Sequence, residues 1–315
     1  MLRDWWIYVE LANTRPPDSN LGDLLQTPRD QPSIRICTSA SLRDQPGVSP
    51  LLEIMFSGGN SHSNVSGRPE HLVILDRPDG DVALMEATVD RERIAMVGPI
   101  LVSSPLELFE RRAMWQAAIE WAQAQNAAAI QLAGDRTTDD CEILAGLGFS
   151  ITTEIGSFAC DNVPWMVADD PMMRTIHLGL DSAEVVELVR RTLVDSLDIP
   201  EAIPFRSPAQ LIQSWLDDGE LWTLVAQAPE GPVGLLVAHR KNETAEITYV
   251  GVAAGQRRLG WGTRLFAQFL KWARDQGIVR ITVIVDRRNS PAIQLYQRFG
   301  FREEAVWMPV VFRRL

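Results

Sequence analysis

The C-terminal half of the chain alternates between short apolar runs and amphipathic stretches in a regular order. RTIHL predicts a strand, and DSAEVVELVRRTL and SPAQLIQSWLDDG predict two helices after it. LWTLVAQ and GPVGLLVAHR, separated by APE, have the pattern of a β-hairpin, and AEITYVGV predicts the next strand. Residues 263–276 carry apolar side chains on one helical face and end before Gly277, which favours a helix. VRITVIV is almost wholly apolar, as in a strand covered on both faces, and a helix is predicted from Asn289-Ser290-Pro291 to Gly300.

The N-terminal half repeats part of this order at a distance of roughly 150 residues, which indicates duplication of a whole domain rather than a solenoid. AIEWAQAQNAAAIQLAGD followed by LAGLGF parallels FLKWARDQGIVRITVIVD followed by LYQRFGF. HLVILDRPDGDVALMEATV predicts a hairpin, and IAMVGPILV is the counterpart of ITYVGVAAG. We therefore expect two domains, residues 1–165 and 174–315. Residues 1–67 are rich in Pro, Ser, Asn and Asp and have no clear pattern.

The stretch QRRLGWG, residues 256–262, lies between a predicted strand and a predicted helix. A glycine-rich turn that opens a helix presents backbone N–H groups without intrahelical partners, and the helix dipole favours an anion there. Gly260 and Gly262 would let a ligand approach the backbone, although they could also serve only to shape the turn. The turn contains neither the GK[ST] of a P-loop nor the GxGxxG of a dinucleotide-binding fold.

The succession that begins with Arg257-Arg258-Leu259-Gly260-Trp261-Gly262 and continues with Asn289, Ala292, Tyr296 and Gly300-Phe301 resembles the GNAT superfamily of acyl-CoA-dependent N-acetyltransferases. The resemblance covers about residues 174–315 and is sharpest over 246–301. It implies a mixed α/β fold with tandem GNAT-like domains, each a mixed, mostly antiparallel sheet flanked by helices. It also implies an enzyme, an acyltransferase that transfers groups other than aminoacyl groups, with acetyl-CoA as cosubstrate. The acetyl group would pass to an amine by direct attack in a ternary complex.

The same resemblance implies which residues hold the cosubstrate. The loop amides would bind the pyrophosphate, the backbone of the preceding strand would pair with the pantetheine arm, and the asparagine that opens the next helix would contact the cosubstrate. The cofactor-binding candidates are Val250, Gly251, Val252, Arg257, Arg258, Leu259, Gly260, Trp261, Gly262, Thr263 and Asn289. The Trp261 side chain would pack against a neighbouring helix or, alternatively, stack on the adenine.

Two residues are candidates for proton transfer. An amine attacks a thioester only when it is deprotonated, so a carboxylate is needed nearby. Glu246 is the candidate base, and its alternative role is a strand glutamate that faces solvent or pairs with an arginine. The leaving thiolate has a solution pKa of about 8.5, and the hydroxyl of Tyr296 would stabilise or protonate it. Tyr296 could also serve only in packing.

In the first half, PLELFE stands where the second half has RRLGWG. It contains no glycine, and the carboxylates of Glu107 and Glu110 would repel a pyrophosphate. Asp139 and Asp140 lie near the place that corresponds to the asparagine. We therefore expect one working site, in the C-terminal domain, beside a degenerate N-terminal domain without a cofactor loop.

Composition excludes several other function classes. There are 30 basic against 41 acidic residues and no long basic run, which argues against binding to nucleic acid or an anionic membrane. No apolar run has the length of a membrane span, and the N-terminus lacks the pattern of a signal peptide. The three cysteines lie before residue 161 without a CxxC pair, and no two histidines have ligand spacing. We expect a cytoplasmic protein that uses no metal ion and no cysteine acyl-enzyme.

Three function classes stay open on the sequence alone. The first is the N-acetyltransferase, acting on a small-molecule or peptide amine. The second is a non-catalytic acyl-CoA-binding sensor or scaffold, and the third is an enzyme that binds a nucleotide phosphate with the same loop. Acceptors that remain open are protein N-termini, lysines, polyamines, aminoglycosides and amino-acid derivatives, and a homodimer also remains open.

Overall fold

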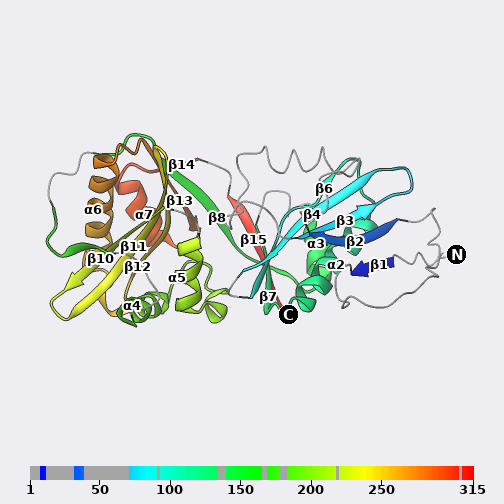
Figure 1. Ribbon diagram of the computed structural model, residues 1–315, viewed down its shortest axis with the longest axis horizontal. Coiled ribbons are helices and arrows are strands. Elements are labelled where there is room, and N and C mark those ends of the chain that lie inside the picture. Colours follow the sequence, from blue (N-terminus) through cyan, green and yellow to red (C-terminus); the bar gives the residue numbers. More distant parts are fainter. Residues whose placement is uncertain are drawn as a thin grey trace, which may run out of the picture. The chain divides into compact units, whose positions relative to one another are not determined.

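The computed structural model describes residues 8–11, 32–38, 71–90, 93–133, 140–164, 169–176, 183–217, 220–304 and 307–315 (Figure 1). The chain forms two compact units. The N-terminal unit comprises Met1–Ser150 together with Val311–Leu315, and the C-terminal unit comprises Ile151–Val310. None of the helices among the described residues combines the length and the apolar character that a membrane crossing requires.

These units divide the chain at other residues than the expected domains, 1–165 and 174–315. Strand β8 (Ser150–Cys160) lies almost wholly in the C-terminal unit because it pairs with β13 (Arg280–Asp286), from Cys160 opposite Ile281 to Ile155 opposite Asp286. The chain then returns to the N-terminal unit at its end, where the Leu315 amide donates to the Ala128 carbonyl. The sequence repeat could not reveal either feature, since both depend on long-range strand pairing.

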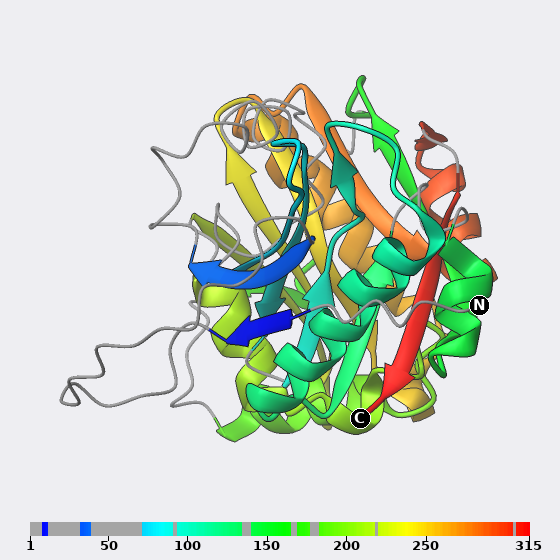
Figure 2. The same cartoon turned by 90° about the vertical axis from the view of Figure 1, so that its right-hand side faces the viewer.

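In the N-terminal unit the strand order is β1-β2-β3-β4-β5-β7, and helix α2 lies across one face of these strands (Figure 2). The elements are β1 (Tyr8–Leu11), β2 (Ser33–Thr38), β3 (His71–Asp76), β4 (Val82–Val89), β5 (Ile94–Val97), β6 (Leu101–Val102), α2 (Leu108–Ala124), β7 (Ala129–Ala133) and α3 (Cys141–Gly146). Met114, Trp115 and Trp121 of α2 are buried in the core of this unit.

In the C-terminal unit the order is β8-β13-β12-β11-β10-β9, and β14 pairs with β8. The further elements are β9 (Met173–Ile176), α4 (Ala183–Leu193), η3 (Ile203–Phe205), α5 (Pro208–Asp217), β10 (Leu221–Ala228), β11 (Gly231–Lys241), β12 (Thr244–Val252), η4 (Ala254–Gln256), α6 (Trp261–Asp275), α7 (Ser290–Arg298) and β14 (Arg302–Glu303). Strand β15 (Met308–Arg314) begins in this unit and belongs to the N-terminal unit from Val311 onward. Within this order only β12 and β13 pair in parallel. The expected mixed, mostly antiparallel sheet is therefore confirmed.

Alternation along the strands divides the core of the C-terminal unit between the two faces of the sheet. Leu224 and Leu236 pack on the side of α6 and α7, whereas their neighbours Val225 and Leu235 pack on the side of α4 and α5 (Figure 1). Successive strand residues point to opposite faces, so each strand serves both layers. This explains why the strands read as nearly continuous apolar runs.

The duplicated order of the two halves is visible in the strand pairing. In the N-terminal unit β4 and β5 are antiparallel, β5 and β7 are parallel, and α2 connects the parallel pair. In the C-terminal unit β11 and β12 are antiparallel, β12 and β13 are parallel, and α6 connects them. The tandem arrangement expected from the repeat is therefore confirmed as a repeated fold.

Candidate active site

A cavity of about 680 Å³ opens between β12 and β13 and reaches the N-terminus of α6. The parallel ladder between the two strands ends at Ile247 opposite Val283, although β12 runs on to Val252 and β13 to Asp286. Beyond that point the strands diverge and both line the cavity. The edge of β12 that faces β13 is therefore left for a ligand.

A β-bulge accompanies this divergence. The register between β11 and β12 shifts so that Val237 pairs with Tyr249 and Ala238 with Ile247, which leaves Thr248 as the extra residue. A bulge bends the strand and increases its twist. The Thr248 hydroxyl lies 2.6 Å from Nδ1 of His239, and this contact anchors the extra residue. Val250, Gly251 and Val252, which follow the bulge, line the cavity.

Glycine at position 251 is required by close packing. A Cβ atom there would lie 2.8 Å from Cβ of Thr192 and 2.8 Å from Cε1 of Tyr249. The Tyr249 hydroxyl is itself 2.7 Å from Oγ1 of Thr192, and its ring centroid is 4.8 Å from that of Trp215. Helix α4 can therefore approach β12 closely only because this residue has no side chain.

The turn between β12 and α6 has the geometry of an anion cradle. Arg258 and Gly260 both have left-handed backbone conformations, with φ of 66° and 85°. The Arg264 amide donates to the Gly260 carbonyl at 3.1 Å. The amides of the three preceding residues, Trp261 to Thr263, belong to the first helical turn, where the helix supplies no acceptor. A Cβ at Gly262 would lie 3.7 Å from Cδ2 of Leu295, inside the cavity lining.

Arg257 has a structural role that the sequence did not predict. Its guanidinium donates to the carbonyl oxygens of Val252, Asp195, Thr192 and Val194 at 2.5–3.1 Å. These bonds tie the end of α4 and the following loop to the turn. Arg258 is exposed, so of the two loop arginines it is the one whose side chain can contact an anion. Leu259 is 65% exposed and does not line the cavity.

The Trp261 side chain is half-buried against the core on the α6 side of the sheet. The guanidinium of Arg264 lies 4.6 Å from its ring centroid, and Asp170 in turn holds Arg264 at 2.6 Å. This arrangement supports packing rather than stacking on a ligand. The residue still contributes to the cavity wall.

Asn289 and Tyr296 come from α7 and its start, and both line the cavity. Oδ1 of Asn289 accepts from the Ala292 amide at 3.3 Å and caps the helix, while its amide NH₂ is left as a donor. The Tyr296 ring is 3% exposed and packs near Phe158, Phe266 and Phe301. Burial raises the pKa of Tyr296, so its hydroxyl stays protonated at neutral pH. Packing and exposure to the cavity therefore coexist in this tyrosine.

Glu246 is not part of the cavity lining. Its side chain is 26% exposed, and Oε2 lies 4.0 Å from Nζ of Lys241. In the register of β11 and β12 it stands opposite His239, whose Nε2 lies 2.9 Å from the Trp215 carbonyl oxygen on the α5 side of the sheet. The structure thus brings together all of the predicted site residues except Leu259 and Glu246.

Several polar residues at this site were missed by the sequence reasoning. Asp198, in the loop between α4 and α5, lines the cavity. Asp286 ends β13 and is fully buried. An acidic residue at the end of a mostly apolar strand was a usable signal for Asp286, but Asp198 lies in a loop without periodicity. Among the described residues, no group of three or more His, Cys, Asp or Glu side chains is placed to hold a metal ion.

The corresponding helix end in the N-terminal unit is closed by the protein's own carboxylates. Oε2 of Glu110 accepts from the Glu107 amide at 2.8 Å, in a capping box at the start of α2. The Arg77 guanidinium forms a salt bridge with the same carboxylate, which is 4% exposed. Asp140 is likewise bound, to Arg111 at 2.7 Å and to the Trp115 indole at 3.1 Å; Asp139 lies outside the described residues. A negative charge thus occupies the helix end that would otherwise attract a phosphate.

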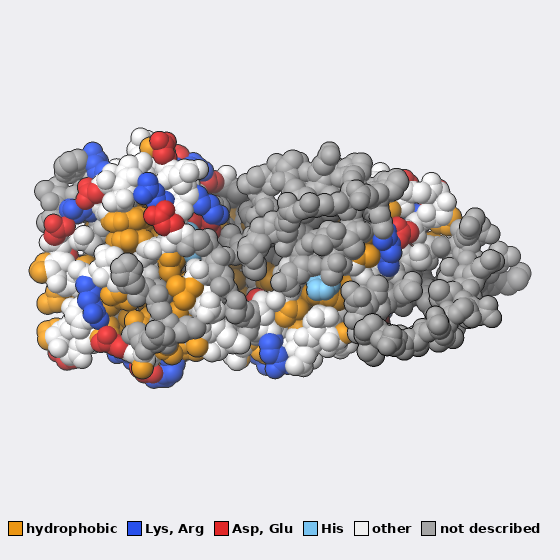
Figure 3. Space-filling model, in the orientation of Figure 1, with side chains coloured by type: hydrophobic (Ala, Val, Ile, Leu, Met, Phe, Trp, Pro, Cys, Tyr) orange, Lys and Arg blue, Asp and Glu red, His pale blue; other side chains and the backbone are white. Residues whose placement is uncertain are grey.

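The surface of the C-terminal unit carries no one-sided basic patch on the face drawn in Figure 3, where Lys and Arg are interspersed with Asp and Glu. Over the full chain the formal net charge is −11.

Residues 187–301 match the profile of the acetyltransferase (GNAT) family. The chain is 28% identical to a mycothiol acetyltransferase of Acidothermus cellulolyticus over 153 residues, 44% of this chain and 47% of that protein. It is also 28% identical to a phosphinothricin N-acetyltransferase of Streptomyces viridochromogenes over 133 residues, 38% of this chain and 69% of that protein. The matched stretch thus spans about half the length of the first of these relatives.

Solved structures share the fold over a larger part of the chain. A GCN5-related N-acetyltransferase from Sphaerobacter thermophilus has a TM-score of 0.57 at 18% identity, over 77% of this chain and 80% of that one. A tandem GNAT protein from the clavulanic acid biosynthesis pathway has a TM-score of 0.51 at 14% identity, over 77% of this chain and 82% of that one. At such identities the likeness concerns the fold alone.

Proposed function

Because residues 187–301 are a domain of the GNAT acetyltransferase family, we propose that the protein is an acetyl-CoA-dependent N-acetyltransferase with one active site, in the C-terminal unit. The observation that carries this proposal is the cavity between the diverging strands β12 and β13, which ends at the uncapped amides of α6. A long, thin ligand with a pyrophosphate at one end fits such a cavity, because its arm can pair with a free strand edge while its phosphates meet a helix N-terminus.

In this proposal the amides of residues 260–263 hold the pyrophosphate and Arg258 adds positive charge. The backbone of residues 250–252 pairs with the pantetheine arm, and the Asn289 side-chain amide donates to the cosubstrate. The Tyr296 hydroxyl protonates the departing sulfur. Glu246 lies outside the cavity lining, so this proposal gives it no contact with the reacting groups.

We propose a small-molecule primary amine as the acceptor. Two of the relatives are named for mycothiol and phosphinothricin, two small molecules. Direct attack of the amine on the thioester is preferred to an acyl-enzyme, since Cys160 is buried on β8 and burial raises the pKa of its thiol. A buried, protonated thiol is a poor nucleophile.

The test is turnover with a panel of amines that includes amino-acid derivatives, aminoglycosides, polyamines and lysine peptides. We expect release of free coenzyme A thiol that depends on one acceptor class, and an acetylated amine by mass spectrometry. Binding of acetyl-CoA without acetylation of any amine would instead support the acyl-CoA sensor. Competition by ATP against coenzyme A would support the nucleotide-phosphate enzyme.

A further inference from the structure

The loop between α4 and α5 places a carboxylate in the cavity wall, near the tyrosine. Asp198 lines the cavity together with Tyr249 and Tyr296. Its Oδ1 accepts a long hydrogen bond of 3.3 Å from the Asp286 amide, and its own amide donates to Oγ of Ser196 at 3.2 Å. The carboxylate therefore keeps acceptor capacity that these contacts do not use.

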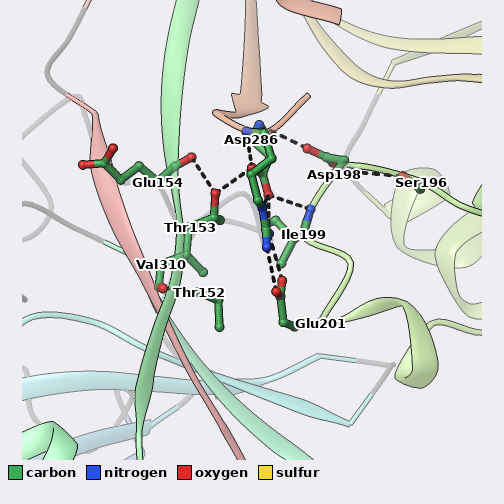
Figure 4. A network of polar contacts seen from close by, with 10 residues as sticks. Thr152, Thr153, Glu154, Ser196, Asp198, Ile199, Glu201, Asp286 and Val310 are labelled. Carbon is green, nitrogen blue, oxygen red and sulfur yellow. Dashed lines mark hydrogen bonds and ion pairs between the residues drawn. The ribbon is translucent and has the colours of Figure 1, made fainter. Parts of the chain in front are cut away.

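The buried carboxylate of Asp286 also holds the loop that carries Asp198, by a hydrogen bond to the residue after Asp198 (Figure 4). Oδ2 of Asp286 accepts from the Ile199 amide at 3.0 Å, and Oδ1 accepts from the Thr153 hydroxyl at 2.6 Å. Arg288 donates to Asp286 at 2.7 Å and to Glu201 at 2.7 and 2.9 Å. Residues immediately after Asp198 are thus fixed to the end of β13, which preorganises its position.

Electrostatics distinguishes these two neighbouring carboxylates. Burial opposes the charge of Asp286, but the hydrogen bonds from Arg288, Thr153 and two amides outweigh it and hold its pKa below the usual range. Burial raises the pKa of Asp198, against the attraction of Arg206. The environment of Asp286 therefore favours its charged form, whereas Asp198 binds a proton more readily than an ordinary aspartate.

Asp198 and Tyr296 line the same cavity, so the carboxylate and the hydroxyl proposed to protonate sulfur border one ligand space. Burial raises the pKa of Tyr296, and the charge of Asp198 acts in the same direction. Glu246 is not part of the cavity lining, and its Oε2 lies 4.0 Å from Nζ of Lys241, the last residue of β11.

We propose that Asp198, rather than Glu246, is the catalytic residue that receives the acceptor amine as a cation and removes its proton. This inference rests on the proposed acetyl transfer in the same cavity. The ammonium gives one proton to the Asp198 carboxylate. The neutral nitrogen then forms the C–N bond to the acetyl carbon, and the C–S bond breaks with its electron pair leaving on sulfur. Tyr296 protonates that sulfur. The nitrogen then gives its second proton to Tyr296, which restores the hydroxyl. Asp198 releases the first proton to solvent and is ready for the next cycle.

The variant Asp198→Asn keeps an oxygen for the Asp286 amide, so we expect it to fold with an unchanged unfolding midpoint and an unchanged Kd for acetyl-CoA. Loss of the base should lower kcat/KM for the amine by ~100-fold or more at neutral pH. In the wild type kcat/KM should fall at acid pH as Asp198 binds a proton, with a midpoint above the ordinary value of about 3.9. In the variant this midpoint should disappear, and the rate should rise with pH as the amine itself deprotonates.

Two matched variants complete the test. Glu246→Gln and the surface change Glu187→Gln each remove one negative charge, and each should leave kcat/KM within ~3-fold of the wild type, since neither lines the cavity. The dependence of kcat/KM on pH also reflects the charged and titratable groups around Asp198. These groups are Arg206, Tyr249, Asp286, Arg288 and Tyr296.

The proposal is overturned if Asp198→Asn keeps the wild-type rate and pH profile, or if the loss appears in Glu246→Gln instead. A wild-type protein that binds acetyl-CoA but acetylates no amine would refute the proposed function itself, and the role of Asp198 with it. These results are distinguishable because the first two require an active wild type.

Discussion

Replacement of Gly262 by alanine should weaken acetyl-CoA binding by at least ~10-fold, the equivalent of one lost charge-assisted hydrogen bond, without loss of fold. The added Cβ would meet Leu295 and Val252 at ordinary contact distances of 3.7 and 4.0 Å, so the free protein accommodates it. Both neighbours line the cavity, so the methyl group occupies space that the phosphates need. Calorimetric titration with acetyl-CoA measures the effect, and thermal unfolding checks the fold.

Gly146→Ala is the matched control for this change. Gly146 is also helical, and its added Cβ would meet only the Arg112 guanidinium, again at 3.7 Å. It lies in the N-terminal unit, outside the cavity lining. Both variants should keep or slightly raise the unfolding midpoint, since alanine favours helices over glycine. Equal acetyl-CoA affinity in the two variants would show that the turn before α6 does not bind the phosphates of acetyl-CoA.

Tyr296→Phe should lower kcat by ~100-fold, the lower end of the range for a group that transfers a proton in the transition state. The change removes only the hydroxyl, while the ring keeps its packing near Phe158, Phe266 and Phe301. We therefore expect Kd for acetyl-CoA and the unfolding midpoint to stay at their wild-type values. Steady-state kinetics at saturating cosubstrate measures the change.

The pH dependence gives this prediction a second readout. Because burial raises the pKa of Tyr296, the hydroxyl is a proton donor throughout the neutral range and is lost only above the ordinary tyrosine value of about 10. Ionisation of Tyr296 should therefore cause no fall in the wild-type kcat between pH 7 and 9. Over this range the Tyr296→Phe variant should differ in the size of kcat but not in the shape of its pH dependence. A kcat for Tyr296→Phe close to that of the wild type would restrict the tyrosine to a packing role.

The elements around the loop were predictable because they depend on local patterns. Apolar spacing in residues 263–276, the glycine that ends the helix and the Asn-Ser-Pro start of α7 each determine structure within a few residues. Tyr296 and the loop glycines could therefore be placed in one site before the fold was known.

What could not be predicted depends on packing across the chain. The divergence of β12 and β13 is accompanied by a bulge at Thr248 that no run of letters marks. The sequence suggested Arg257 as a phosphate ligand, but four carbonyl oxygens accept its hydrogen bonds, three of them from residues 192–195. The loop that carries Asp198 is bonded to Asp286, which lies far along the chain. Glu246 has the residue type of a base, but it is not part of the cavity lining.

The central claim is that this chain has one acetyl-CoA site and that the site lies in the C-terminal unit. Calorimetric titration of the wild-type protein with acetyl-CoA tests it most directly, because stoichiometry does not depend on knowing the acceptor. We predict one acetyl-CoA bound per chain, since Glu110 and Arg77 close the corresponding helix end of the N-terminal unit. Two molecules per chain, or none, would contradict it.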